Sequence, residues 1–151
     1  MGLVRGSMCL NRLWMLPVCA LVGAMAGGCS SANGPKPVPV TGRVLLDGRP
    51  LAHAQVVFLP AASPSPSAPR PTAVTDEEGR FRPSTFAQND GAPEGEYTVL
   101  VTWYPLVGPK GQEEAGPNVL PPRYADPQRS PLKAVVAKGT AELEPFQIAR
   151  K

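Results

Sequence analysis

Three acidic side chains stand side by side in TDEEGRF, residues 75–81, and carboxylates this close together raise the question of a calcium site. An EF-hand calcium loop takes oxygen ligands from alternate positions and a bidentate glutamate near its end. Here Asp76, Glu77 and Glu78 are adjacent, so their side chains point to different sides, and the next glutamate is Glu94. Asp at a turn start can bond its own backbone, and Gly79 accepts the positive φ that closes a turn. The segment therefore predicts a turn between two strands, with calcium binding as the less favoured alternative.

The sequence contains few residues of the types and spacings that catalytic sites need. The chain has one histidine, His53, whereas a zinc peptidase needs at least two histidines, or one with spaced acidic ligands. A serine hydrolase of the G-x-S-x-G type would need a nucleophile elbow that the sequence does not contain. His53 lies in PLAHAQ between two apolar runs, where we expect a partly exposed loop residue. The sequence predicts a protein that is not an enzyme, with no cofactor and no metal site.

Three aromatic residues, Trp103, Tyr104 and Tyr124, flank a long proline-containing connection and are the candidate ligand-binding residues. Together they could form a platform for a sugar or a peptide. The favoured alternative places Trp103 in the core and lets the tyrosines close one end of the domain, as partly buried aromatic residues usually do. An exposed strand edge could also accept a strand from a partner.

The first 28 residues have the layout of a secretory signal. Arg5 and Arg12 form a basic start, Leu13 to Ala26 is an apolar run, and small residues follow. The run is too short to span a membrane. Removal of the whole signal takes away both early arginines and leaves 13 basic and 12 acidic residues, a net charge of +1. The remaining arginines are scattered, so the sequence gives no support for nucleic-acid binding.

Cys29 is the only cysteine that lies outside this signal. The sequence Met25-Ala26-Gly27-Gly28-Cys29 resembles the lipobox of bacterial lipoproteins, in which the cysteine is acylated and the chain is cut just before it. Ala26 stands where leucine is usual, and Ala24-Met25-Ala26 offers an ordinary signal-peptidase site as an alternative. We expect a membrane anchor on Cys29 in the cell envelope, at the outer membrane or the periplasmic face. The alternative is a soluble secreted protein.

The remaining chain predicts a short tether and one β domain. Residues 29–37 are small, polar and proline-bearing, as tethers are. Residues 38–151 contain about seven apolar, β-branched or alternating runs separated by turn signals. The expected strands cover Val40–Leu46, Gln55–Leu59, Thr72–Thr75, a short piece at Phe81, Glu96–Trp103, Leu132–Ala137 and Leu143–Ala149. Pro145 interrupts the last strand and predicts an edge position for it.

Four blocks carry a family resemblance: VTGRVLLDGRPLAHAQVVFLP, TDEEGRF, DGAPEGEYTVLVTW and LPPRYADPQRSPLKAVV. Their order resembles bacterial lipoproteins described as carboxypeptidase-regulatory-like or transthyretin-like domain proteins. The resemblance implies an all-β, seven-stranded, Greek-key β-sandwich of the prealbumin-like or Ig-like kind, without peptidase activity. It leads us to expect a structural or protein-interaction role at the cell envelope, with an unknown protein partner. The alternative is a module that binds a carbohydrate or cell-wall polysaccharide.

Overall fold

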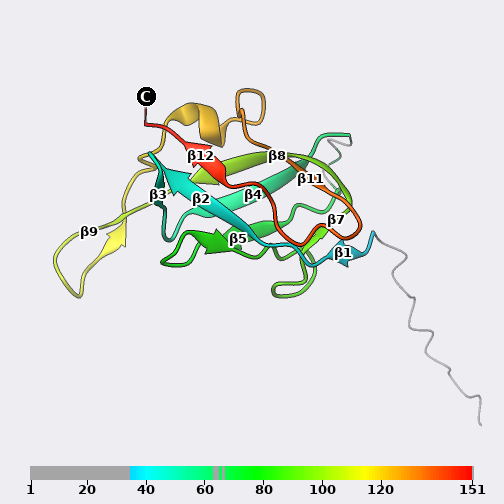
Figure 1. Ribbon diagram of the computed structural model, residues 1–151. Helices are drawn as coiled ribbons and strands as arrows, with labels where there is room; N and C mark the ends of the chain where they lie inside the picture. The colour runs from blue at the N-terminus through cyan, green and yellow to red at the C-terminus, as the bar shows by residue number, and fades with distance from the viewer. Residues whose placement is uncertain (1–34, 63–64, 66, 151) are drawn as a thin grey trace, which may run out of the picture. The chain divides into compact units, whose positions relative to one another are not determined.

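The computed structural model describes residues 35–62, 65 and 67–150, which form a mostly β structure (Figure 1). The only helical element of these residues is the 3₁₀ turn η1 (Pro122–Ala125). The seven expected strands appear as β2 (Gly42–Leu46), β4 (Gln55–Pro60), β5 (Thr72–Val74), β6 (Arg80–Phe81), β8 (Gly95–Thr102), β11 (Lys133–Val136) and β12 (Phe146–Ile148). Five two-residue segments were not expected: β1 (Pro37–Val38), β3 (Arg49–Pro50), β7 (Ala92–Pro93), β9 (Leu106–Val107) and β10 (Glu114–Ala115).

One antiparallel sheet has the strand order β11-β8-β4-β5. Its centre is the pair of β4 and β8, which runs from Gln55 opposite Thr102 to Pro60 opposite Tyr97. These strands form because β-branched and aromatic side chains alternate along them, which suits a pleated surface with one buried face. The buried face carries Val56 and Phe58 from β4, and Tyr97, Val99 and Val101 from β8.

A second four-stranded sheet is built on β2. It has the order β12-β2-β3, and β6 pairs with the beginning of β2. β12 runs parallel to β2, with Phe146 opposite Val44 and Ile148 opposite Leu46. β12 is a terminal strand of this sheet, so the edge position predicted from Pro145 is confirmed.

Both sheets contribute to one core, in which four aromatic rings meet. The Phe58 ring from the first sheet contacts the rings of Tyr97, Phe81 and Phe146 at centroid distances of 5.8, 6.0 and 6.4 Å. Phe81 and Phe146 stack on each other at 5.9 Å. Burial raises the pKa of the Tyr97 phenol, which donates a hydrogen bond to the Pro93 carbonyl (2.7 Å). The core therefore joins β4 and β8 to β6 and β12.

The expected signal segment and Cys29 lie outside the described residues. Pro37, the last residue of the expected tether, pairs with Pro93 where β1 meets β7. The structure therefore shows strand pairing at Pro37, one residue before the expected start of the domain.

Candidate functional site

TDEEGRF forms a turn, as predicted, and Asp76 organises it. The Asp76 carboxylate accepts hydrogen bonds from the backbone N–H groups of Glu78 (3.1 Å) and Arg80 (2.8 Å). Gly79 has φ of 69°, and a Cβ added there would lie 2.6 Å from the Val44 carbonyl oxygen. Only glycine combines this backbone conformation with so close an approach. The acidic run therefore shapes a turn that packs against β2.

His53 lies in the turn between β3 and β4, and its side chain is exposed as expected. Its Nε2 lies 3.1 Å from Oε1 of Glu77, so the exposed acidic run and this histidine form a surface pair. Within the described part of the chain, no three His, Cys, Asp or Glu side chains gather in an arrangement that could hold a metal ion.

Trp103 and Tyr104 border one cavity of about 750 Å³, which we call the aromatic groove. It lies between the β3 turn region and the start of the long connection after β8. Its lining consists of Leu46, Arg49, Pro50, Leu51, Ala52, His53, Trp103, Tyr104, Pro105, Leu106 and Arg150. Trp103 is partly buried against the core, whereas Tyr104 is 40% exposed.

Asn118 holds the two ends of the long connection together beside the aromatic groove. Its Oδ1 accepts hydrogen bonds from the backbone N–H groups of Trp103 (3.0 Å) and Leu120 (3.2 Å). The Val119 N–H donates to the Trp103 carbonyl (3.1 Å). Between these ends, β9 and β10 pair as a small hairpin that projects away from the two sheets (Figure 1). The groove's aromatic side is therefore fixed at the base of this hairpin.

Tyr124 does not belong to the aromatic groove. It is 3% exposed, and its hydroxyl accepts a hydrogen bond from the Ala149 N–H (3.0 Å). The Arg123 guanidinium also donates to this hydroxyl (3.2 Å) and lies over the Tyr124 ring. The structure thus brings together two of the three aromatic candidates and places the third in the core, where it ties η1 to the end of β12.

The ionised side chains that line the aromatic groove belong to two arginines, Arg49 and Arg150. Arg150 pairs with Asp47 (3.6 Å) outside the groove, and His53 pairs with Glu77. Arg49 makes no side-chain ion pair or hydrogen bond with any described residue. No acidic residue is among the residues that line the groove. An apolar occupant that carries a negative charge would therefore fit this surface.

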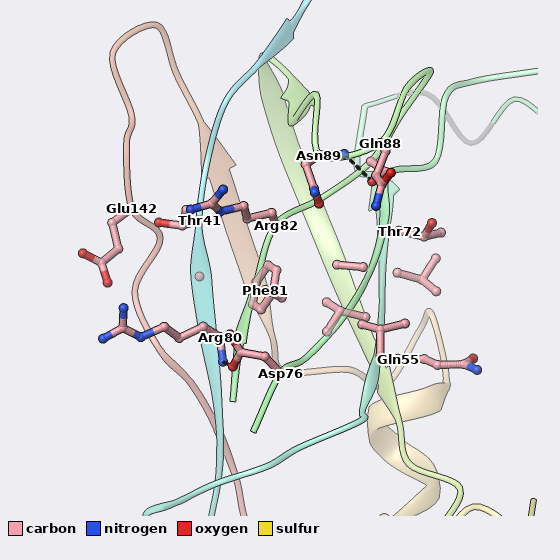
Figure 2. Close-up of a pocket in the computed structure, with 16 residues that line it drawn as sticks. Thr41, Gln55, Thr72, Asp76, Arg80, Phe81, Arg82, Gln88, Asn89 and Glu142 are labelled. Atoms are coloured by element: carbon pink, nitrogen blue, oxygen red, sulfur yellow. Dashed lines mark hydrogen bonds between the residues drawn. The ribbon is translucent and has the colours of Figure 1, made fainter. Parts of the chain in front are cut away.

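A second cavity, of about 910 Å³, lies where the hairpin formed by residues 72–84 opens in its middle (Figure 2). Thr72 and Ser84 exchange two backbone hydrogen bonds (3.0 and 2.8 Å), and the Asp76 N–H donates to the Arg80 carbonyl (2.8 Å). In that register Val74 stands opposite Arg82, yet no backbone hydrogen bond joins these two residues in the structure. We call this cavity the open-hairpin pocket.

The hairpin opens because its two arms belong to different sheets. β5 pairs with β4, whereas Phe81 in β6 pairs with Gly42 in β2. A Cβ at Gly42 would overlap the Phe81 ring, so the glycine is what allows this ring to lie against the β2 backbone. Arg80, Arg82, Thr41 and Glu142 stand on one side of the pocket, and Gln55, Thr72 and Gln88 stand on the other (Figure 2). Sequence reasoning missed this site, because nothing local in TDEEGRF shows which strand each arm pairs with.

Asp90 fixes the loop that forms one end of the open-hairpin pocket. Its carboxylate accepts hydrogen bonds from the backbone N–H groups of Thr85 (2.7 Å), Phe86 (3.0 Å) and Ala87 (3.0 Å). Burial alone would raise the pKa of Asp90, but these hydrogen bonds outweigh it and hold the pKa below its ordinary value of 3.8. Hydrogen bonds to the Asp90 carboxylate therefore fix the loop that carries Gln88 and Asn89.

Among the described residues, the structure contains no helix of the length and apolar character needed to cross a membrane. Comparison with known proteins found no family model, no curated protein and no solved structure that matches this chain.

Proposed function

We propose that this protein is an exported, non-catalytic lipoprotein whose transthyretin-like β-sandwich binds a protein partner at the cell envelope. The export signal and Cys29 support the location, and the order of the sequence blocks supports the seven-stranded, Greek-key sandwich. Two sheets that share one aromatic core are consistent with that fold. The partner role rests on a separate observation at the β9–β10 hairpin.

That observation is a concentration of exposed apolar side chains. Of the seven large hydrophobic residues that are exposed in the described part of the chain, four lie between residues 104 and 119: Tyr104, Leu106, Val107 and Val119. Contiguous exposed apolar surface on a soluble domain marks interaction sites. The basic lining of the adjoining aromatic groove adds a charge preference. The partner is therefore a protein segment whose apolar side chains contact the hairpin, which itself carries Glu113 and Glu114, and whose carboxylates reach the basic groove.

Site-specific photocrosslinking in intact host cells tests this proposal. A photoreactive phenylalanine analogue at Val107 should give a reproducible protein adduct, because this residue lies on the exposed hairpin. The same analogue at Val135 is the matched control. This valine is also strongly exposed, but it lies on β11, the edge strand of the β11-β8-β4-β5 sheet, and not on the hairpin. An adduct from both positions, or from neither, would count against a partner at the hairpin.

Carbohydrate binding remains the second candidate, and the observation that favours it is the shared position of Trp103 and Tyr104 at one groove. An aromatic face beside a polar arginine can stack on a sugar ring while the guanidinium binds its hydroxyl groups. Tyr104→Ala would then abolish binding to cell-wall polysaccharide and leave the fold intact, because Tyr104 is exposed.

A further inference from the structure

We propose that the open-hairpin pocket is a binding site for a neutral saccharide, separate from the protein-binding hairpin proposed above. This inference goes beyond the proposed function and rests on different residues. Its first support is the set of main-chain groups that face the pocket without a protein partner.

Successive residues of β5 direct their backbone N–H and C=O groups to opposite sides of the strand. Pro71 and Thr75 bond to β4, through Phe58 N–H to Pro71 carbonyl (2.9 Å) and Thr75 N–H to Ala54 carbonyl (3.0 Å). Thr72 and Val74 lie at the alternate positions and face the other hairpin arm, where Thr72 bonds to Ser84. Antiparallel pairing alternates in this way, so the N–H and C=O groups of Val74 point towards the pocket.

Arg82 presents its main chain from the other arm. Gly79 and Phe81 face β2, where the Gly79 carbonyl accepts from the Val44 N–H (2.8 Å) and Phe81 stands opposite Gly42. By the same alternation, the N–H and C=O of Arg82 face β5. Two donors and two acceptors of the main chain therefore border one cavity and make no hydrogen bond with each other.

Several polar side chains around these main-chain groups also lack a partner among the described residues. The side chains of Gln55, Gln88, Arg80, Arg82 and Glu142 make no hydrogen bond or ion pair with any described residue. Guanidinium groups only donate, the carboxylate only accepts, and each amide does both. A saccharide hydroxyl both donates and accepts, so a sugar with several hydroxyls can use all three kinds of group at once.

The charge of the lining favours a neutral ligand. Two arginines, Arg80 and Arg82, are balanced by two carboxylates, Asp76 and Glu142, at the same cavity. A strongly anionic or cationic ligand would meet two like charges there. Asp76 is already engaged with the turn backbone, and this leaves Glu142 as the free acceptor.

A peptide ligand is less well matched to this pocket. Binding energy at peptide and protein interfaces concentrates in apolar or aromatic anchors that enter pockets. The aromatic residue here, Phe81, is 3% exposed, and its ring is committed to the core. The pocket joins hydrogen-bonding groups to aliphatic side chains such as Val57 and Val74 and has no free aromatic ring, and from this lining we infer a polyhydroxylated ligand.

Binding is measured by calorimetry with the processed protein purified from its host. The probes are short soluble oligomers of glucose, mannose, galactose and N-acetylglucosamine, titrated separately. We expect at least one oligomer to bind, and Arg82→Ala and Gln55→Ala to weaken its binding about tenfold or more each. Arg129→Ala and Gln147→Ala are matched controls on exposed positions outside the pocket, and they should leave the affinity unchanged.

Hydrogen exchange gives a readout that is specific to the main-chain groups. The bound oligomer should slow amide exchange in the segment 72–84, with Val74 and Arg82 most affected. The proposal is overturned if no oligomer binds, or if an extended peptide library binds at the pocket instead. It is also overturned if Tyr104→Ala abolishes oligomer binding while Arg82→Ala and Gln55→Ala do not. That last result would move carbohydrate binding to the aromatic groove.

Discussion

Thr75 joins two segments of the core through one hydroxyl group. It is 2% exposed, donates to the Leu51 carbonyl (2.6 Å) and accepts from the Ala54 N–H (2.8 Å). Thr75→Val keeps the shape of the side chain but leaves a buried donor and a buried acceptor unpaired. We expect a loss of about 2–3 kcal/mol in the free energy of unfolding, measured by urea denaturation.

Thr102→Val is the matched control for this substitution. Thr102 ends β8 on the outer face, where its hydroxyl has no hydrogen-bond partner among the described residues. Its replacement should change the free energy of unfolding by less than about 0.5 kcal/mol. Equal effects of the two substitutions would contradict the role given to the Thr75 hydroxyl, whereas Thr75→Ser should retain most of the stability.

The same residues show what the sequence could and could not predict at this scale. The turn at Asp76 and the exposure of His53 followed from local chemistry, and both are confirmed. The burial of Thr75 did not, because its two partners lie more than twenty positions away and belong to a different turn. Tyr124 posed the same difficulty: only tertiary contacts decide whether an aromatic residue next to a loop is buried.

The loop of residues 84–91 depends on one carboxylate, and this makes its stability dependent on pH. The pKa of Asp90 is lower in the folded protein than its ordinary value of 3.8. A depressed carboxyl pKa adds stability that is complete above the unfolded pKa and is lost as pH falls through the folded pKa. The contribution of Asp90 should therefore be present at neutral pH and fade below about pH 4.

Asp90→Asn tests this dependence. An asparagine can accept hydrogen bonds through only one oxygen, so it cannot satisfy the Thr85, Phe86 and Ala87 amides as the carboxylate does. We expect the variant to be about 1–2 kcal/mol less stable at pH 7 and this difference to be smaller at pH 3, by urea denaturation. A difference that is the same at both pH values would show that the charge has no part in holding the loop.

Individual elements were predictable, whereas their partners were not. The alternation in Glu96–Trp103 predicted β8 to within one residue at each end, and Phe146 and Ile148 face the core as expected. The pattern that predicts a strand contains no information on its neighbours. For this reason the split of β5 and β6 between two sheets, and the pocket that this split creates, appeared only in the structure.

At the scale of the whole molecule, one core supports two surfaces of different chemistry. The hairpin at residues 104–119 carries exposed apolar side chains and adjoins a basic groove, whereas the open-hairpin pocket is lined by polar and aliphatic side chains and has balanced charges. Phe81 is the one core ring that borders either surface, and its ring is buried rather than available to a ligand. Substitutions at exposed positions of either surface should therefore alter binding without unfolding the domain, and this makes the two proposals separable by experiment.

Attachment to the membrane is the property of the whole molecule that Cys29 should determine. If Cys29 is acylated, the protein isolated from its host should have the mass of residues 29–151 plus acyl chains, and it should sediment with membranes. Several acyl chains hold a protein at a bilayer firmly, where one would hold it only marginally. Cys29→Ser removes the thiol that forms the thioether, so this variant should leave the membrane fraction. An unmodified mass that begins at Gly27 would instead show cleavage after Ala26, and the two proposed binding surfaces would then belong to a soluble secreted protein.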